Sequence, residues 1–314
     1  NMKKIGSSTL EVSDLNLGGN TFGWTASEAE SHAVLDAYAD AGGNFIDTAD
    51  VYSEWKPGNS GGESESIIGS WLQKRGNRKD VIIATKVSKL SKRPGLGAAN
   101  IAAAVDESLK RLKSDYIDLY YAHADDPETP LEETLTAFDQ VVKAGKVRYI
   151  AASNYSQERL AEALSISKSH GLVSYIGLQP HFNLLEQGEF PVEYRDFCAA
   201  NNVGVMPYYG VARGFLTGKY QPGISVDSAR AGGVEKYCNS RGWKTLEIIK
   251  DLAQRHGVSY AAISLAWLRA QTSITAPIAS ARIVSQLPDL MQTPTLSSEE
   301  IATLTLAGSE EAAV

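Results

Sequence analysis

Short apolar runs alternate along the chain with longer segments in which apolar residues recur at helical spacing. The short runs are rich in Val, Ile and Tyr and are apolar throughout, which predicts strands that are covered on both faces. Eight such strands are predicted, over Leu15–Gly19, Asn44–Thr48, Val81–Val87, Ile117–Ala122, Val147–Ala152, Tyr175–Gln179, Gly204–Tyr208 and Ile274–Ile278.

The segments between these runs have the pattern of amphipathic helices, and the clearest is Leu131–Ala144. Thr129 with Glu132 predicts a capping box at its start, where Pro130 suits the first helical position, and Gly145 suits its end. Ser297 with Glu300 predicts the cap of a last helix. The other predicted helices span Ala29–Ala41, Glu63–Arg75, Ile101–Lys113, Gln157–His170, Val192–Ala200, Thr245–His256 and Tyr260–Ala270.

Strand–helix alternation repeated eight times predicts an α/β fold with a parallel sheet and right-handed crossovers. We expect an eight-stranded (β/α)8 TIM barrel with a short N-terminal hairpin and a C-terminal helical extension, forming one domain over residues 1–314. A doubly wound open sheet is the alternative, but the glycines of Gly18–Gly23 do not form the G-x-G-x-x-G fingerprint that opens a helix in that fold. Two stretches break the alternation, Val87–Ala99 and the Gly-rich Thr217–Asn239, and the second is long enough to suggest a functional loop.

Composition narrows the class of partner. The chain has 314 residues, of which 43% are hydrophobic, and it contains no apolar run of the length needed to cross a membrane. The net charge is −7 and no block of Lys or Arg stands out. We therefore expect a soluble globular protein, with neither nucleic acid nor a membrane as its main partner.

The two cysteines, Cys198 and Cys238, lie far apart and have no metal-ligand spacing. This pattern indicates a reducing compartment without a disulfide framework, and no metal site is expected. No targeting segment is recognisable, so we expect a cytoplasmic protein.

Four polar side chains follow three successive predicted strands. Asp47 closes the second strand and Tyr52 lies on the loop after it. Lys86 closes the third strand and His123 the fourth. In a (β/α)8 barrel the active site lies at the C-terminal ends of the strands, so the four side chains are expected to converge in one pocket.

These residue types form a coherent set for proton transfer. A tyrosine titrates at about pH 10, and a neighbouring Lys86 cation would stabilise the phenolate and lower the pKa of Tyr52. Asp47 would keep the lysine charged, and His123 would orient a carbonyl group or relay its proton. The set suits protonation of a carbonyl oxygen while a cofactor delivers a hydride.

Each residue also has a simpler reading. Asp47 could cap a helix or lie solvated on a loop, Lys86 could extend to the barrel rim, and His123 could be a satisfied core residue. Tyr52 could simply pack, and a structural role is expected for Asp50. We favour one common site, because four unrelated roles at consecutive strand ends form a less economical explanation.

On these residues the sequence resembles the aldo-keto reductases, and the resemblance extends from about Met2 to Leu306, including the branch that contains bacterial reductases and channel β-subunits. The resemblance implies a (β/α)8 barrel that uses a nicotinamide cofactor, usually NADPH, to reduce aldehydes and ketones reversibly. It also implies Tyr52 as the general acid, Lys86 and Asp47 as the pair that tunes it, and His123 as the carbonyl-orienting group.

The resemblance implies an NADP(H) site built from further motifs. The segments LGGN, ASNYS, MPYYGVARGFLTGKY and PIASARIVSQLPDL match the family's contacts to the ribose, the carboxamide, the ring and pyrophosphate, and the adenosine. The cofactor-binding residues implied are Asp47 and Gly18, Gly19, Asn20, Ser153, Asn154, Gln179, Tyr208, Tyr209, Gly210, Val211, Ala212, Gly214, Lys219, Arg230, Ser280, Arg282, Gln286 and Asp289. Arg282 suits a 2′-phosphate, which favours NADP over NAD, although a solvated charge at a helix start is the alternative.

The chain departs from the family pattern at two places. Tyr209-Gly210-Val211 stands where many relatives have Ser-Pro-Leu, and Leu290 stands where relatives often carry an asparagine that contacts adenine. Both changes concern cofactor affinity and leave the four catalytic candidates untouched.

Trp24 and Trp55 follow the first two strands and are the candidates for the substrate pocket, where two aromatic side chains would favour a flat substrate. Packing within the loops is the alternative. Two other functions stay open: an NADP-binding accessory subunit with poor turnover, and a barrel lyase or isomerase without a redox step. The physiological substrate and the oligomeric state do not follow from the sequence.

Overall fold

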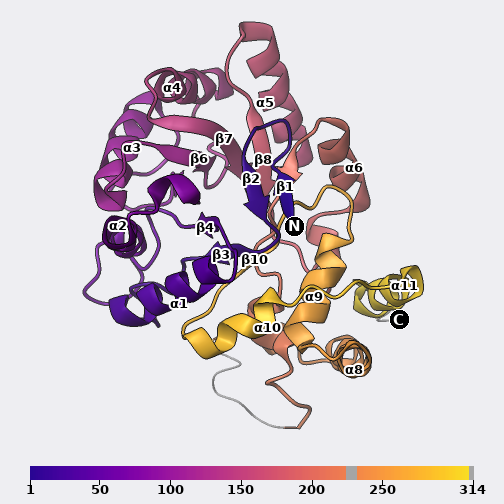
Figure 1. Ribbon diagram of the computed structural model, residues 1–314. Coiled ribbons are helices and arrows are strands. Elements are labelled where there is room, and N and C mark those ends of the chain that lie inside the picture. Colours follow the sequence, from indigo (N-terminus) through magenta and orange to yellow (C-terminus); the bar gives the residue numbers. More distant parts are fainter. Residues whose placement is uncertain (224–231, 311–314) are drawn as a thin grey trace.

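A computed structural model describes residues 1–223 and 232–310 of the chain, and in these residues the strands form a parallel barrel surrounded by helices (Figure 1). The sheet has eight strands in the order β10-β3-β4-β5-β6-β7-β8-β9, each parallel to its neighbour. The strands are β3 (Asn16–Gly18), β4 (Phe45–Asp47), β5 (Ile82–Val87), β6 (Ile117–Ala122), β7 (Val147–Ser153), β8 (Tyr175–Gln179), β9 (Gly204–Val205) and β10 (Ile278–Ala279). The expected (β/α)8 fold is confirmed.

The barrel closes between β9 and the segment that leads into β10. Val205 forms a parallel bridge with Ile274, its amide donates to the carbonyl of Ser273 at 3.1 Å, and the amide of Thr275 donates back to Val205 at 2.8 Å. The eighth strand was predicted over Ile274–Ile278, whereas regular pairing with β3 begins only at Ile278. The first part of this segment therefore pairs with β9, and its last part pairs with β3.

The expected N-terminal hairpin is present as β1 (Met2–Lys4) and β2 (Glu11–Ser13), which pair antiparallel. Its side chains Ile5, Leu10 and Val12 are buried against the interior of the barrel, where Phe45 and Leu119 belong to the same apolar cluster. The hairpin thus seals the N-terminal end of the barrel, and the opposite end, where the strands finish, is left for a site.

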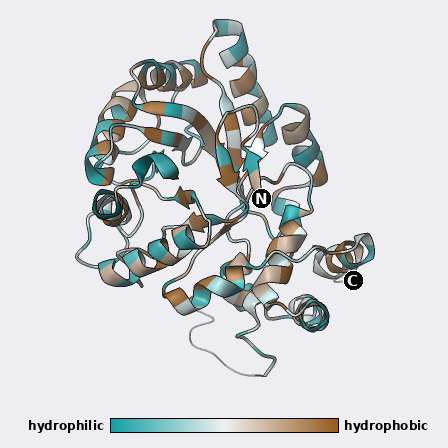
Figure 2. Cartoon of the chain, in the orientation of Figure 1, coloured by the Kyte–Doolittle hydropathy of each residue, from teal (hydrophilic) through white to brown (hydrophobic). Residues whose placement is uncertain are grey.

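Helices pack around the sheet and bury apolar side chains against it. Hydrophobic and hydrophilic residues alternate along these helices (Figure 2). The helices are α1 (Glu28–Asp40), α2 (Glu63–Arg75), α3 (Ala98–Leu112), α4 (Leu131–Lys143), α5 (Gln157–His170), α6 (Val192–Ala200), α8 (Ser240–His256), α9 (Tyr260–Arg269), α10 (Leu287–Met291) and α11 (Ser298–Gly308), with short helical turns η1 (Arg78–Asp80), η2 (Gln187–Glu189), η3 (Ala212–Thr217), η4 (Glu235–Tyr237) and η5 (Val284–Gln286). The predicted bounds of α2, α5 and α6 are confirmed. No helix within the described part of the chain is long and apolar enough to cross a membrane.

The start of α4 differs from the expectation. The predicted capping box is absent, since Pro130 is itself the N-cap and no side chain caps the helix. The hydroxyl of Thr129 donates instead to Asp126 at 2.6 Å, a carboxylate that also accepts from the amide of Leu96 at 2.9 Å. By contrast, the predicted capping box of Ser297 with Glu300 on α11 is confirmed. The Asp126 carboxylate, three residues before Thr129, therefore takes the hydroxyl that the predicted capping box required.

Candidate active site

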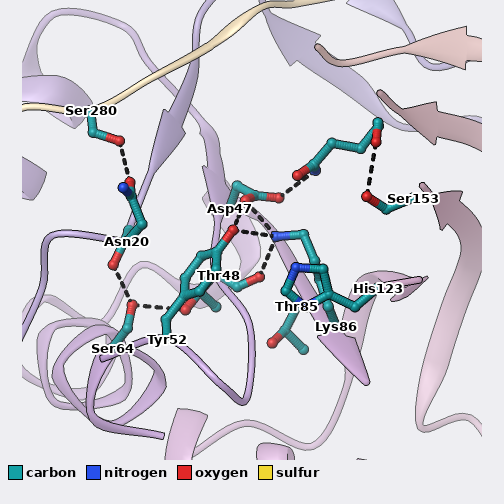
Figure 3. A network of polar contacts seen from close by, with 12 residues as sticks. Asn20, Asp47, Thr48, Tyr52, Ser64, Thr85, Lys86, His123, Ser153 and Ser280 are labelled. Atoms are coloured by element: carbon teal, nitrogen blue, oxygen red, sulfur yellow. Dashed lines mark hydrogen bonds and ion pairs between the residues drawn. The ribbon is translucent and has the colours of Figure 1, made fainter. Parts of the chain in front are cut away.

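Four predicted side chains converge at the C-terminal ends of β4, β5 and β6 (Figure 3). The ammonium of Lys86 donates to Asp47 Oδ2 at 2.6 Å and to the Tyr52 hydroxyl oxygen at 3.0 Å. Its third hydrogen bond, at 2.8 Å, goes to the carbonyl of Thr48. The lysine therefore has no spare donor, and its position beneath the phenol is fixed.

Asp47 is held on both sides. Its Oδ2 faces Lys86 and, at 3.4 Å, the Tyr52 hydroxyl. Its Oδ1 accepts from Gln179 Nε2 at 3.0 Å, and the Gln179 carbonyl in turn accepts from Ser153 at 2.8 Å. A chain of hydrogen bonds thus runs from β7 through β8 across the barrel to the ion pair on β4 and β5 (Figure 3).

Burial controls the protonation states of this cluster. Desolvation, and after it the Asp47 charge, hold the pKa of Tyr52 well above its usual value. Desolvation lowers the pKa of Lys86, while Asp47 opposes that change. The sequence predicted a lowered pKa for Tyr52, and this prediction is wrong. The pKa is raised because burial and the nearby Asp47 carboxylate both disfavour the phenolate. The phenol consequently keeps its proton at neutral pH.

His123 lies beside the phenol, with ring centroids 6.0 Å apart in an edge-to-face arrangement. Burial, together with the charges of Lys86 and Lys89, holds its pKa well below the usual value. The ring is therefore neutral at physiological pH and carries one N–H donor. Its backbone carbonyl accepts from Asn154 Nδ2 at 2.9 Å.

A second buried polar cluster lies on the same strands and loops. Glu65 of α2 accepts from Thr85 at 2.6 Å and from Arg111 of α3 at 2.7 Å. Asp50 is fully buried, and neither of its carboxylate oxygens has a hydrogen-bond partner among the described residues. Burial and the nearby Glu65 raise the pKa of Asp50 to about 8, so that it is protonated at neutral pH. Asp50 contributes to the interior of the fold and not to the lining of the cavity.

A cavity of about 1260 Å³ opens over the tetrad of Asp47, Tyr52, Lys86 and His123 and extends along the strand ends to α10. The predicted residues that line it are Gly18, Asn20, Trp24, Asp47, Tyr52, Trp55, His123, Ser153, Asn154, Gln179, Tyr208, Tyr209, Gly210, Val211, Gly214, Lys219, Ser280, Arg282, Gln286 and Asp289. This volume exceeds the few hundred cubic ångströms of an ordinary ligand pocket and suits two molecules bound side by side.

Three predicted residues stand apart from the lining. Ala212, the first residue of η3, is fully buried, and so is Lys86. Gly19 is packed so closely that a Cβ there would lie 2.9 Å from Ser64 Oγ. Arg230 lies outside the described residues.

Two glycines of the cavity lining occupy positions where a side chain is disfavoured. A Cβ on Gly18 would lie 2.5 Å from Ser280 Oγ, so a side chain there would have to displace Ser280. Ser280 donates to Asn20 Oδ1 at the same place. Gly214 has φ +94°, a conformation that side-chain-bearing residues rarely adopt.

Aromatic and polar groups line the middle of the cavity. The rings of His181 and Tyr208 stack with centroids 5.4 Å apart and an interplanar angle of 13°. The Tyr208 hydroxyl donates to Asn154 Oδ1 at 2.7 Å. Asn183 donates to the Tyr209 carbonyl at 2.9 Å and so holds the loop that carries Tyr209. His181, by contrast, is itself part of the lining.

The segment after β9 departs from ordinary backbone geometry. Tyr209 has φ 57° and Arg213 has φ 57°, both in the left-handed region. The Arg213 guanidinium lies over the Tyr209 ring, 4.3 Å from its centroid. Residues keep such strained backbone conformations only where the surrounding structure holds them, and they are typical of functional loops.

Trp24 and Trp55 meet edge to face at the rim, with ring centroids 5.4 Å apart. They are 43% and 48% exposed, so a large apolar area on the rim is uncovered beside Tyr52. The sequence analysis did not identify several other lining residues. These are Thr21, Val51, Lys89, His181, Arg213, Thr217, Gly232, Ser259, Ala261, Ile278 and Ala279. Leu290, which the sequence analysis named as a departure from the family pattern, also lines the cavity. Lys89 follows the predicted strand end at Lys86, and Arg213 lies within the recognised segment MPYYGVARGFLTGKY, so the charge at these positions is the signal that could have identified them.

Comparison with known proteins shows which proteins this chain is similar to. A sequence profile described as Aldo/keto reductase family matches residues 14–307. The protein named Protein tas from Escherichia coli (strain K12) is 33% identical over 312 residues, which cover 90% of each chain. A probable voltage-gated potassium channel subunit beta from Oryza sativa subsp. japonica is 33% identical, covering 92% of this chain and 90% of the relative. The aldo-keto reductase yakc [NADP(+)] from Schizosaccharomyces pombe (strain 972 / ATCC 24843) is 32% identical, covering 91% and 84%.

Proposed function

The chain belongs to the aldo/keto reductase family and is thus related to its oxidoreductases, and we propose that it catalyses the reversible NADPH-dependent reduction of an aldehyde or ketone to an alcohol. The observation that carries the proposal is the buried Lys86, which donates to both Asp47 and the Tyr52 hydroxyl at the floor of a cavity large enough for cofactor and substrate.

Tyr52 is proposed as the general acid. Its raised pKa keeps the proton on the phenol until a substrate oxygen becomes basic enough to take it. Lys86 then stabilises the phenolate, because its fully buried ammonium lies 3.0 Å from the phenol oxygen. Asp47 keeps that ammonium charged and correctly oriented.

His123 is proposed to orient the carbonyl. As a neutral imidazole in the lining of the cavity it can donate one N–H to a carbonyl oxygen. A neutral donor polarises the carbonyl without placing a second cation beside Lys86. The Lys86 charge itself disfavours a protonated His123.

The cavity residues fit a nicotinamide dinucleotide. Asn154, Ser153 and Gln179 offer amide and hydroxyl groups for a carboxamide at the tetrad end. At the other end Ser280 and Arg282 suit a ribose phosphate, and the positive-φ turn at Gly214 beside Lys219 suits a pyrophosphate. When bound, the nicotinamide supplies the hydride that reduces the carbonyl carbon. The preference for NADP rests on Arg282 and on the name of the yeast relative.

The test combines binding with turnover. NADPH and NADH are titrated separately while the tryptophan fluorescence is followed, and loss of the reduced-nicotinamide absorbance is then recorded with a panel of aldehydes and ketones that includes 4-nitrobenzaldehyde. We expect tighter binding of NADPH than of NADH, and turnover of at least one carbonyl. Binding of neither nucleotide would overturn the proposal.

A second candidate is an NADP-binding accessory subunit with poor turnover. The similarity to a probable channel β-subunit over 92% of this chain favours it. Tight NADPH binding without turnover of any carbonyl in the panel is the result expected for this function. Measurable reduction of several aldehydes would exclude it as the main role.

A further inference from the structure

The tetrad end of the cavity carries a lysine that the proposed chemistry does not use. Lys89 lies on the loop between β5 and α3, and it lines the cavity together with Trp24 and Trp55. Within residues 1–223 and 232–310 it forms no ion pair, whereas Lys86 is paired with Asp47. Its three N–H donors are thus open to a ligand on the side where the substrate would lie.

The backbone that carries Lys89 is held in an unusual conformation. Ser88 has φ 125°, in a region that residues with side chains rarely adopt, and its hydroxyl has no partner among the described residues. The amide of Gly95 donates to the Ser88 carbonyl at 2.9 Å, and Ser88 bridges Pro94. A strained, pinned residue immediately before a lysine that lines the cavity indicates that the loop is built to present this side chain.

The charge of Lys89 acts on the reacting groups. It contributes to the lowered pKa of both His123 and Lys86, so the ammonium lies within electrostatic range of the position where a carbonyl would bind. The pKa of Lys89 itself is lowered by partial desolvation alone. An anion on the substrate would offset this cost.

The other charged groups of the lining are committed elsewhere. The Arg213 guanidinium covers the Tyr209 ring, Lys219 approaches Gly214, and Arg282 lies at the α10 end. The carboxylates of the lining are Asp47, which is paired with Lys86, and Asp289, which lies near α10. Among the described lining residues, Lys89 is therefore the open cation at the substrate end, and no unpaired carboxylate opposes it there.

We propose that Lys89 is the anion-binding residue of the substrate site and that the substrate is an aromatic aldehyde or ketone bearing a carboxylate. This inference rests on the proposed function and adds to it the class of substrate. Trp24 and Trp55 provide the apolar wall for the ring, Tyr52 and His123 hold the carbonyl, and Lys89 binds the carboxylate. Three fixed points would then set the orientation of the substrate.

The experiment compares two aldehydes that differ in charge, 4-carboxybenzaldehyde and methyl 4-formylbenzoate. The measured quantity is the ratio of their kcat/KM values, in which any general loss of activity cancels. We expect Lys89→Met to lower the ratio roughly tenfold through the KM of the acid, since a hydrogen bond to a charged group contributes about that much. Lys89→Glu should lower it further. The 3-carboxy isomer shows whether the distance between carbonyl and carboxylate matters.

Lys92→Met is the matched control. Lys92 lies on the same loop, is exposed and does not line the cavity, so its removal should leave the ratio at the wild-type value. A ratio that survives Lys89→Met would overturn the inference, as would one that falls equally with Lys92→Met. A ratio that falls only with Arg213→Met would assign the carboxylate to Arg213 and would also overturn it.

A binding measurement separates this inference from the proposed function. Quenching of tryptophan fluorescence by 4-carboxybenzaldehyde is followed without turnover, in wild type and in Lys89→Met. If neither aldehyde is reduced but the quenching requires Lys89, the reductase proposal fails and the anion site stands. If both aldehydes are reduced with no dependence on Lys89, the function stands and the anion site fails.

Discussion

Lys86 Nζ lies 2.6 Å from Asp47 Oδ2, and both side chains are buried with at most 1% of their surface exposed. This ion pair connects two neighbouring strands, β4 and β5, and its lysine donates a hydrogen bond to the Tyr52 hydroxyl. A buried pair of this kind contributes little net stability, but removing one partner leaves an uncompensated charge in the interior.

Lys86→Met is therefore expected to lower the free energy of unfolding by about 3–5 kcal/mol, because it leaves the Asp47 carboxylate buried and unpaired. Urea unfolding at neutral pH measures this loss. Combining it with Asp47→Asn should recover part of the stability, since the remaining side chain is then neutral. A double variant that is less stable than Lys86→Met would contradict the role of the ion pair.

Tyr52→Phe is expected to reduce kcat by at least about 100-fold, the usual contribution of a positioned general acid. NADPH affinity should stay close to the wild-type value, because the phenyl ring keeps the shape of the pocket. Stopped-flow and fluorescence titration measure the two quantities. Tyr149→Phe is the control, since its hydroxyl contacts Thr9 at the sealed end of the barrel. Near-wild-type kcat in Tyr52→Phe would show that another group donates the proton.

His123 should remain neutral across the physiological pH range, because burial and two lysines hold its pKa well below 6.5. The profile of kcat against pH is therefore expected to show no step from His123 in the region where an exposed histidine titrates. The profile is measured for wild type and for His123→Asn at equal ionic strength. An inflection near the ordinary histidine pKa that vanishes in His123→Asn would disprove this assignment.

Asp50→Asn is expected to stabilise the protein increasingly as the pH rises. Between the ordinary pKa of 3.8 and the folded value of about 8, folded Asp50 retains a proton that the unfolded chain has released. The free energy of unfolding of the wild type therefore falls through this window, and a neutral asparagine avoids the loss. At about 1.4 kcal/mol per pKa unit, the full effect corresponds to several kcal/mol.

This difference is measured by urea unfolding at several pH values from acid to mildly alkaline. Glu65 from α2, Arg111 from α3 and Lys86 from β5 face Asp50, so they must be intact in both proteins. Asp115→Asn is the control, because Asp115 is exposed. Equal pH dependence in wild type and Asp50→Asn would show that Asp50 is ionised in the fold.

Gly18→Ala is expected to weaken NADPH binding roughly tenfold, since even a small misfit at a packed contact costs about 1–3 kcal/mol. Its Cβ would lie 2.5 Å from Ser280 Oγ and would displace that side chain, which lines the cavity. Fluorescence titration with NADPH measures the change. Gly97→Ala is the control, because its Cβ would have no contact closer than 3.5 Å. Unchanged affinity in Gly18→Ala would place the cofactor away from β3.

The order of the elements and the location of the site were both predictable from the sequence. The bounds of β6 and β8 agree with the predicted ranges, because a strand that is covered on both faces is apolar throughout and needs no tertiary information to be recognised. Asp47, Lys86 and His123 could be placed together for a related reason. They follow successive parallel strands, and the ends of such strands lie at the same edge of the barrel.

Tertiary structure decided what depends on partners that are distant in the chain. The barrel closes through Val205 and Ile274, where pairing is too short to leave a periodic pattern. Asp50 is buried without a partner among the described residues, and Lys89 faces the cavity. Sequence alone determined which side chains were available. Burial and the charges brought beside each group determined their protonation states, because the cost of removing a charge from water depends on everything that surrounds it.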